Sequence, residues 1–401
     1  MVKTAVLGYG TVGSGIVEVI KTNQEMVNKK AGVDIDVKYI LDLRDFPGDP
    51  YENLVVHDVE AILNDEEVSI VCEAMGGIEP AYTFSKRALM AGKSVCTSNK
   101  ELVAKHGPEL IQIARENNCN YLFEASVGGG IPIIRPINSS LTPERIEAIT
   151  GILNGTTNYI LTKMEREGSD FSEVLKEAQE KGYAERNPEA DVEGYDACRK
   201  IAILSSLVYG KTVNFEDIYT EGITKISTRD FAYMKQIDST IKLLGMSRYV
   251  DGKYFAMVAP FVIGRDNALY SVNDVFNAIL VKGNTLGETM YYGKGAGKLP
   301  TASAVVSDVI DCAKHVGKNI FCFWDPEKLQ LAGIEDAKRR FFVRVEGSDK
   351  AKAEAAFGKV SFLDAGFSDE TGFITEVMSE KEYKEKAEAA GNVISMIRVE
   401  E

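Results

Sequence analysis

The chain has 401 residues, of which 45% are hydrophobic and 26% charged, and its formal net charge is −14. This length and apolar content can supply two or three domains, each with its own core. The excess of acidic residues disfavours polyanionic partners, so we expect neither a nucleic acid nor an acidic membrane surface.

The N-terminus and the cysteines suggest a cellular compartment. The opening "MVKTAVLGYG" lacks the cationic and apolar segments of a signal peptide, and no apolar run approaches the roughly 20 residues that span a bilayer. The six cysteines are scattered without a CxxC pair, which is typical of free thiols in a reducing compartment. We therefore expect a cytoplasmic protein.

Strands and helices alternate in the first 126 residues. Strands are predicted at 2–8, 34–41, 68–75, 94–98 and 120–126. Helices are predicted between them at 11–21, 79–92 and 100–118, the last despite Pro108. This alternation predicts an α/β fold with a parallel sheet and helices on both faces.

The motif "GYGTVG" lies between the first strand and the first helix. In this context Gly8 permits a tight turn, Gly10 lets the backbone approach a pyrophosphate, and Gly13 allows close helix–sheet packing. The helix N-terminus adds a partial positive charge. The motif therefore predicts a Rossmann dinucleotide-binding domain.

The second strand ends in "ILDLRDF", where a Rossmann domain reads the ribose. Asp42 could accept a hydrogen bond from a 2′-hydroxyl and favour NAD, whereas Arg44 could pair with a 2′-phosphate and favour NADP. Either residue could equally belong to a solvated loop, so the choice between NAD and NADP stays open.

The pattern changes to mixed α+β after residue 127. A strand at 145–153 is followed by helices near 156–167, 171–181 and 194–209, a further helix at 228–245, and strands at 254–264 and 277–283. An amphipathic helix is predicted at 301–317 and a polar linker at 327–340. The last segment reads β-α-β-β-α-β, as in a small ferredoxin-like module.

These patterns predict three domains. A Rossmann domain covers 1–130 and is completed by 300–325, a substrate-binding, catalytic and dimerisation domain covers 131–299, and the ferredoxin-like module covers 338–401.

The helix near 194–209 carries an unusual pair of charges, Asp196 and Lys200. At about 100° per residue, both lie among Ile and Leu side chains, while Arg199 and Ser206 form the polar stripe. A desolvated ion pair is costly unless a function retains it, although a lysine can also pack its stem on a core and reach solvent. The pair is therefore a candidate active site.

Other candidate residues lie near this helix or at the ends of strands. The loop "GYAERNPEAD" brings Glu185, Glu189 and Asp191 before the helix, although Asp191 could act only as a helix N-terminal charge. Lys100 follows a strand of the parallel sheet, where ligands bind, but it could also be a surface residue. The second glycine-rich stretch, "GKGAGKLPTAS", is either an anion-binding turn or a connector.

Taken together, residues 1–325 resemble homoserine dehydrogenase. The resemblance rests on "GYGTVG", "EAMGGIEPA", "GKSVCTSNKELVA", "EASVGGGIPIIRPI", "GILNGTTNYILTKM", "KGYAERNPEADVEGYDACRKIAI" and "LGETMYYGKGAGKLPTASAVVSD". It implies NAD(P)-dependent interconversion of L-homoserine and L-aspartate 4-semialdehyde, on the route to threonine and methionine, by a homodimer or higher homo-oligomer.

The resemblance also assigns roles to residues. Lys200 corresponds to the proton donor, assisted by Lys100, and the substrate-binding positions are Glu185, Asp191, Asp196 and Gly182. The cofactor-binding positions are Gly8, Tyr9, Gly10, Thr11, Val12, Gly13, Arg44, Lys100 and Gly295. A monovalent cation, sodium, is implied at the largely backbone carbonyl groups of Glu124, Val127, Gly129 and Ile131.

The C-terminal module resembles an ACT domain, which in this family can bind an amino-acid end product. It has "GSDKAKAEAAFG" where such domains carry a "PGVLA"-like opening. This difference argues against feedback by threonine, and a dimerisation or vestigial role is an equal alternative for the module.

Two rival functions remain at this point. One is another Rossmann amino-acid oxidoreductase, for instance a phosphorylating semialdehyde dehydrogenase, which would use a cysteine nucleophile, with Cys96 and Cys198 as the candidates. A cofactor-sensing regulatory protein would bind NAD(P) without turnover.

Overall fold

The computed structural model describes residues 1–400, which form two compact units. Unit 1 comprises 1–144, 202–214 and 293–329, and unit 2 comprises 145–201, 215–292 and 330–400. Within the described residues, no helix has both the length and the apolar character needed to cross a membrane.

Unit 1 contains a six-stranded parallel sheet in the order β3-β2-β1-β4-β5-β6. The strands are β1 (Val2–Leu7), β2 (Ile35–Leu41), β3 (Val55–Val56), β4 (Val68–Glu73), β5 (Ser94–Thr97) and β6 (Tyr121–Leu122). The order reverses at β1, which is the doubly wound Rossmann arrangement. The α/β fold predicted for this part of the chain is confirmed.

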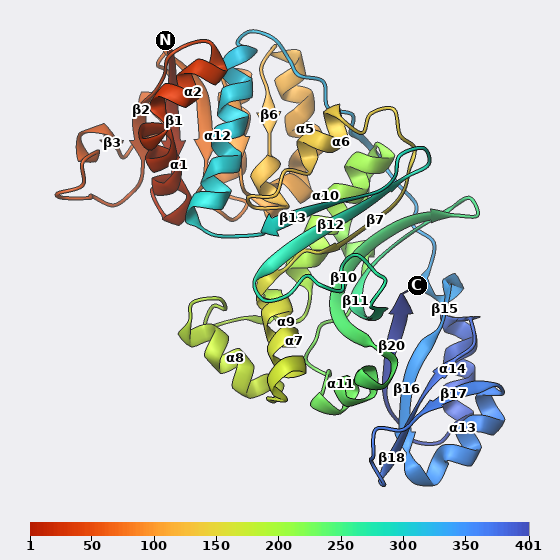
Figure 1. Cartoon of the computed structure of the whole chain (residues 1–401). Coiled ribbons are helices and arrows are strands. Elements are labelled where there is room, and N and C mark those ends of the chain that lie inside the picture. The colour runs from red at the N-terminus through yellow and green to blue at the C-terminus, as the bar shows by residue number, and fades with distance from the viewer. Residues whose placement is uncertain (401) are drawn as a thin grey trace. The chain divides into compact units, whose positions relative to one another are not determined.

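The helices of unit 1 cover this sheet (Figure 1). They are α1 (Thr11–Thr22), α2 (Gln24–Ala31), α3 (Glu60–Leu63), α4 (Ala81–Met90), α5 (Lys100–Glu116), α6 (Ile134–Ser139) and α12 (Lys298–Lys314). α12 comes from far along the chain and packs on α1, where a Cβ at Gly15 would lie 3.0 Å from the Ala302 side chain. The glycine therefore allows the two helices to approach closely.

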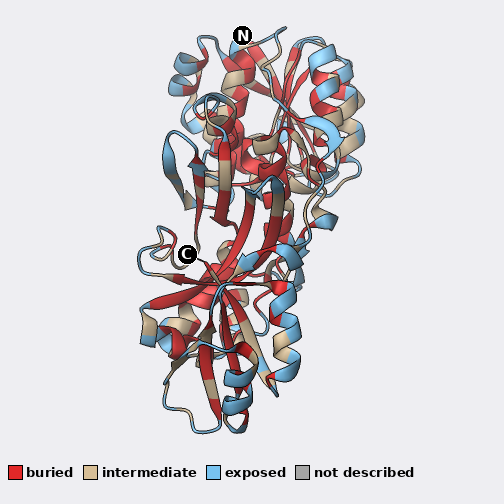
Figure 2. Cartoon of the chain, turned by 90° about the vertical axis from the view of Figure 1, so that its right-hand side faces the viewer, coloured by how far each residue is buried: buried red, intermediate tan, exposed pale blue. Residues whose placement is uncertain are grey.

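Unit 2 is built on a mixed sheet of ten strands. Its order is β13-β12-β7-β10-β11-β20-β16-β18-β17, with β9 also paired to β11. The first part comprises β7 (Ile146–Ile152), β9 (Tyr219–Thr220), β10 (Ser239–Val250), β11 (Lys253–Gly264), β12 (Phe276–Gly283) and β13 (Gly287–Lys294). Figure 2 shows long stretches of these strands as buried and the outer faces of the helices as exposed.

The helices expected after the first strand of this unit are present. They are α7 (Gly155–Glu167), α8 (Phe171–Glu180) and α10 (Tyr195–Tyr209), and a short helix that was not predicted, α9 (Glu189–Val192), precedes α10. α10 contributes its residues up to Ile201 to unit 2 and the remainder to unit 1.

The helix predicted over 228–245 is wrong in its second half. Helix α11 covers only Thr228–Met234, and the chain continues as β10 from Ser239. Residues 239–247 are all buried, and a strand buried on both faces has no alternating pattern to separate it from a buried helix. Asp238, with a φ of +47°, stands at the point of change.

The C-terminal module, defined here as residues 341–400, has the predicted β-α-β-β-α-β order. It contains β16 (Phe341–Glu346), α13 (Lys350–Phe357), β17 (Val360–Leu363), β18 (Glu370–Thr375), α14 (Glu380–Ala389) and β20 (Val393–Glu400). β20 also pairs in parallel with β11, so one sheet runs through the module and the rest of unit 2. The division into three domains stays a prediction.

The stretch 327–340, expected as a linker, also contains short strands. β14 (Asp325–Lys328) pairs with β8 (Lys211–Thr212), and β15 (Lys338–Arg339) pairs with β19 (Met378–Ser379).

Candidate active site

The glycine loop of unit 1 has the geometry of a dinucleotide cradle. Gly8 has a φ of +90°, and its N–H donates to the Leu41 carbonyl at 2.8 Å. A Cβ at Gly13 would lie 1.8 Å from the Gly8 oxygen, so only glycine fits there. A Cβ at Gly10 would meet no atom within 4 Å, which leaves space above the loop. Thr11 and Val12 then open α1, whose N-terminal dipole favours a phosphate.

Asp42 at the end of β2 is tied to this loop. Its carboxylate accepts from the Tyr9 N–H at 2.8 Å and from the Arg44 Nε and Nη2 at 3.0 Å each. The Arg44 guanidinium holds the pKa of the Asp42 carboxyl well below its usual range. A pocket of about 380 Å³ is lined by Asp42 and Arg44 together with His57 and Met75. Asp42 is therefore ionised and already engaged on both oxygens.

A buried carboxyl, Glu73, organises the next loops of unit 1 and was not predicted from the sequence. Its Oε2 accepts from the Thr97 hydroxyl at 2.6 Å, and its Oε1 accepts from the Met75 N–H at 2.8 Å. The Thr97 hydroxyl also accepts from the Asn99 N–H at 2.9 Å, and Asn99 caps α5 at Leu102. Lys100, the first residue of α5 and half-buried, is therefore held at the carboxyl end of β5.

The charged pair on α10 in unit 2 is buried, as the helical projection predicted. Asp196 is 5% exposed and Lys200 is 8% exposed, and the Lys200 Nζ lies 2.7 Å from the Asp196 Oδ2. The same ammonium donates to the Leu153 carbonyl at 2.8 Å. The prediction that Ser206 lies on a polar stripe is wrong. Ser206 is fully buried, and its hydroxyl tolerates burial because it donates to the Ala202 carbonyl one turn earlier.

Asn154 joins the carboxylates of this cluster. Its Nδ2 donates to the Asp191 Oδ1 at 2.8 Å and to the Asp196 Oδ2 at 2.9 Å, so both amide protons are used. Its Oδ1 accepts from the Thr157 N–H at 2.9 Å and caps α7. The Asn-Gly-Thr-Thr sequence signals the cap. The contacts with Asp191 and Asp196 cross 37 and 42 residues, and no local pattern signals them.

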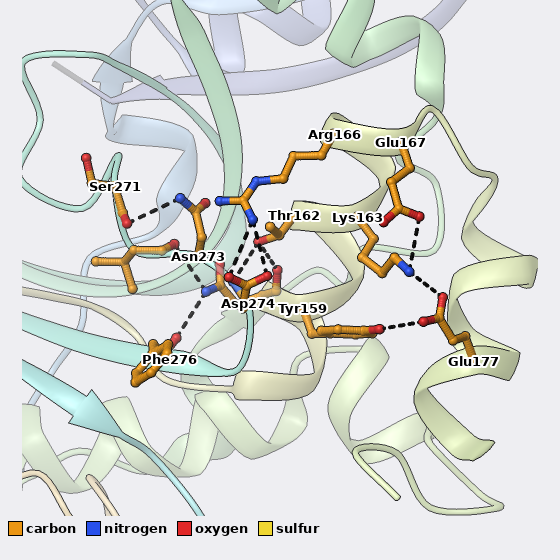
Figure 3. A network of polar contacts seen from close by, with 12 residues as sticks. Tyr159, Thr162, Lys163, Arg166, Glu167, Glu177, Ser271, Asn273, Asp274 and Phe276 are labelled. Carbon is orange, nitrogen blue, oxygen red and sulfur yellow. Dashed lines mark hydrogen bonds and ion pairs between the residues drawn. The ribbon is translucent and has the colours of Figure 1, made fainter. Parts of the chain in front are cut away.

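The helix that begins at Asn154 is fixed along its length. Figure 3 shows Glu177 of α8 beside Tyr159 and Lys163 of α7. The Glu177 carboxylate accepts from the Tyr159 hydroxyl at 2.9 Å and from the Lys163 Nζ at 2.6 Å. The Asp274 N–H donates to the Thr162 hydroxyl at 3.0 Å on another side of the helix. These contacts hold α7, and with it the position of the Asn154 amide.

Glu185 and Gly182 do not join the buried cluster. Both lie exposed in the stretch between α8 and α9, and the Glu185 carbonyl accepts from the Gln179 Nε2 at 3.0 Å. Gly182 has a φ of +73°, which favours glycine there. The structure thus brings Asp191, Asp196 and Lys200 together and leaves Glu185 and Gly182 on the surface.

Comparisons with known proteins decide the family. The family profile described as homoserine dehydrogenase matches residues 132–310, and the profile for its NAD-binding domain matches residues 8–124. A homoserine dehydrogenase from Synechocystis sp. is 39% identical, with 99% of each chain covered. The chain belongs to the homoserine dehydrogenase family.

Solved structures agree with this assignment. The homoserine dehydrogenase of Thiobacillus denitrificans has a TM-score of 0.87 and 33% identity over 100% of this chain and 98% of that one. A hyperthermophilic archaeal homoserine dehydrogenase in complex with NADPH has a TM-score of 0.66 and 30% identity over 78% of this chain and 97% of that one. The predicted oxidoreductase class and NAD(P) binding are confirmed at the level of the family.

The turn that the homoserine dehydrogenase resemblance links to a cation is tightly built. The Glu124 carboxylate accepts three N–H groups at the start of α6, from Ile133, Ile134 and Arg135 at 2.6, 2.9 and 2.6 Å. Gly129 has a φ of +56°, and a Cβ there would lie 2.3 Å from the Gly295 oxygen. The two glycine-rich stretches therefore pack against each other. Val127 and Ile131 in the same turn are buried.

The resemblance noted in the sequence implies backbone carbonyl ligands in this turn. No cluster of three or more His, Cys, Asp or Glu side chains that could hold a metal occurs in residues 1–400. The Glu124 carboxylate is occupied by N–H donors, which leaves its main-chain carbonyl as its contribution. A compact glycine turn is compatible with a small monovalent cation held by carbonyl oxygens.

The cysteines do not suit the rival semialdehyde dehydrogenase chemistry. Cys96 and Cys198 are both buried, and burial raises the pKa of both thiols. A thiolate nucleophile requires the opposite shift. The absence of a low-pKa thiol at either position agrees with homoserine dehydrogenase, whose chemistry needs no cysteine.

Proposed function

We propose that this chain is an NAD(P)-dependent oxidoreductase that interconverts L-homoserine and L-aspartate 4-semialdehyde, in threonine and methionine biosynthesis. The observation that carries the proposal is the buried Lys200 ammonium, held between Asp196 and the Leu153 carbonyl in a chain of this family. General acid–base catalysis needs such a positioned donor.

Lys200 would move the proton in this reaction. When bound, the nicotinamide supplies the hydride in reduction and accepts it in oxidation. During reduction the aldehyde oxygen gains negative charge, and the Lys200 ammonium donates a proton to it. During oxidation the neutral amine of Lys200 takes the proton from the homoserine hydroxyl. Asp196 fixes the direction of the ammonium and stabilises its charge.

The neighbouring carboxylates would hold the substrate. Asp191 and Asp196 share the amide of Asn154 and present negative charge to the α-ammonium group of an amino acid. Glu185 and Gly182, in the exposed stretch before α9, are proposed to complete the substrate-binding set, as the resemblance implies. Lys100 keeps its proposed role as the assisting lysine.

The cradle in unit 1 fits a dinucleotide, because Gly10 leaves space and α1 supplies N–H groups. The proposed cofactor contacts are made by Gly8, Tyr9, Gly10, Thr11, Val12, Gly13, Arg44, Lys100 and Gly295. We propose that NADP is accepted, because Arg44 neutralises Asp42 and its side chain is 64% exposed, within the same pocket as His57.

Four further properties are proposed. A sodium ion would bind the carbonyls of the 124–131 turn, as the compactness of that turn suggests. A homodimer or higher homo-oligomer would use unit 2, where β13 is an edge strand with exposed Met290 and Tyr292. An ACT-like role of the C-terminal module is supported by its sheet order, β20-β16-β18-β17. A cytoplasmic location is supported by the six free cysteines of the chain.

The test is a steady-state assay of purified protein with L-homoserine and, separately, NAD and NADP. We expect reduced cofactor to accumulate when L-homoserine and the oxidised cofactor are both present. The rate should depend on the concentration of sodium or potassium ions. Tight cofactor binding without turnover would instead support a sensor, and a phosphate requirement would support a phosphorylating semialdehyde dehydrogenase.

A further inference from the structure

A buried arginine of the C-terminal module reaches out of the module. Arg398 on β20 is 1% exposed, and its Nε and Nη2 donate to the two oxygens of Glu380 at 2.7 and 3.0 Å. Its Nη1 donates to the Glu221 Oε2 at 2.7 Å, and its guanidinium stacks on the Tyr219 ring at 4.9 Å. The Glu380 pair lies within the module, whereas Glu221 belongs to a different part of unit 2. A charge so deeply buried is retained only with such partners.

Glu221 lies in a short segment, residues 219–223, that is fixed on two sides. On one side β9 pairs with β11, and the Glu221 N–H donates to the Val258 carbonyl at 2.8 Å. On the other side the Ile223 N–H donates to the Val192 carbonyl at 2.8 Å. A Cβ at Gly222 would lie 2.2 Å from that same carbonyl oxygen, so the two backbones are in direct contact.

The backbone contacted in this way carries the proposed substrate carboxylates. Val192 directly follows Asp191, and Gly194, with a φ of +83°, leads into α10 and Asp196. A Cβ at Gly194 would lie 3.2 Å from the Thr220 side chain, so this turn also rests on the 219–223 segment. Asp191 and Asp196 therefore flank a turn whose position depends on that segment.

We propose that Arg398 and Glu221 are positioning residues for the substrate-binding carboxylates. The Arg398–Glu221 ion pair holds the 219–223 segment, the segment holds residues 192–194, and these set the spacing of Asp191 and Asp196. The C-terminal module thereby contributes to substrate binding without contacting the substrate. The inference rests on the proposed role of those carboxylates in holding homoserine.

The test compares Glu221→Ala with a matched control, Arg229→Ala. Arg229 also pairs with the module, through Asp369 and Glu370 at 2.8 Å each, but it does so from α11. We expect Glu221→Ala to raise the KM for homoserine about tenfold, because small displacements of binding groups have large kinetic effects. kcat and the KM for NADP should change less than twofold, and Arg229→Ala should leave the homoserine KM unchanged.

A conservative variant keeps the test decisive if Glu221→Ala does not fold. Glu221→Gln retains one acceptor for Arg398 and should raise the homoserine KM by only about threefold, still above the Arg229→Ala value. The inference would be overturned if Glu221→Gln and Arg229→Ala had the same KM for homoserine. It would also be overturned if the Glu221 variants changed kcat, the KM for homoserine and the KM for NADP together. Asp196→Asn is measured in parallel. If it leaves homoserine kinetics unchanged, the proposed substrate site itself is wrong, which is a different failure.

Discussion

Replacing Lys200 by methionine removes the ammonium while keeping a side chain of similar length in the apolar surroundings of α10. The ammonium makes two contacts, at 2.7 Å to Asp196 and 2.8 Å to the Leu153 carbonyl, and both are lost. A positioned general acid or base contributes about 10²- to 10⁴-fold to a rate. We therefore expect kcat to fall by at least about 100-fold, equivalent to about 2.7 kcal/mol or more in the activation free energy.

The same substitution also affects stability, which must be separated from catalysis. Breaking a buried ion pair costs about 3–5 kcal/mol because the remaining charge is uncompensated. The Asn154 amide still donates to Asp196, so we expect a loss at the lower end of that range. The double variant Asp196→Asn/Lys200→Met removes both charges of the Asp196–Lys200 ion pair, and most of the stability should return.

The assay follows reduced cofactor by absorbance with homoserine as substrate, and thermal melting is measured on the same samples. Cofactor binding, measured by fluorescence titration, should be unchanged in both variants. We expect the double variant to melt close to the wild type and yet to stay at least 100-fold slower. A Lys200→Met protein with kcat within tenfold of the wild type would refute the assignment of Lys200 as proton donor.

Three further predictions follow from other contacts. Asn154→Asp keeps the cap of α7 but adds a carboxylate beside two others, so the homoserine KM should rise more in this variant than in Asn154→Ala. Loss of the cap in Asn154→Ala should lower the free energy of unfolding by about 1 kcal/mol. A hydrogen bond to the Asp42 carbonyl raises the pKa of His57. The positive charge of the His57 imidazole is lost as the pH rises through that pKa. The KM for NADP should therefore increase from pH 6 to 9 while that for NAD does not, and His57→Gln should remove this difference. Burial lowers the pKa of Lys242 from 10.5 to about 8. Burying the charged form of Lys242 reduces the free energy of unfolding by up to about 3 kcal/mol below pH 8, and this cost disappears above pH 10.5. The wild type should therefore gain stability relative to Lys242→Met as the pH rises from 8 to 10.5.

The features that the sequence predicts well are those determined by neighbouring residues. The glycine loop is recognisable because Gly8, Gly10 and Gly13 lie between a strand and a helix, and each glycine has a local steric reason. The burial of Asp196 and Lys200 follows from helical periodicity alone. Both observations need only about 15 consecutive residues.

The features that were missed depend on contacts between distant residues. Asn154 meets Asp191 across 37 residues, and Glu73 meets Thr97 across 24, so neither role has a local signature. The strand β10 was predicted as helix because burial on both faces removes the alternation that identifies strands. Ser206 was predicted to lie on a polar stripe because periodicity does not report that a hydroxyl can bond to its own helix.

The charges of the α10 cluster explain why an amino acid, rather than a simple alcohol, suits this site. Asp191 and Asp196 present two carboxylates near the Lys200 ammonium, and Asn154 donates one amide proton to each of them. Asp196 is almost fully buried and Asp191 is half-buried. An α-ammonium group would pair with these carboxylates in a medium where electrostatic interactions are strong. A hydroxy acid that lacks the ammonium could not make this ion pair. Substrate selectivity would then arise from the same carboxylate that orients the proton donor, so that binding and proton transfer depend on one arrangement of Asp196.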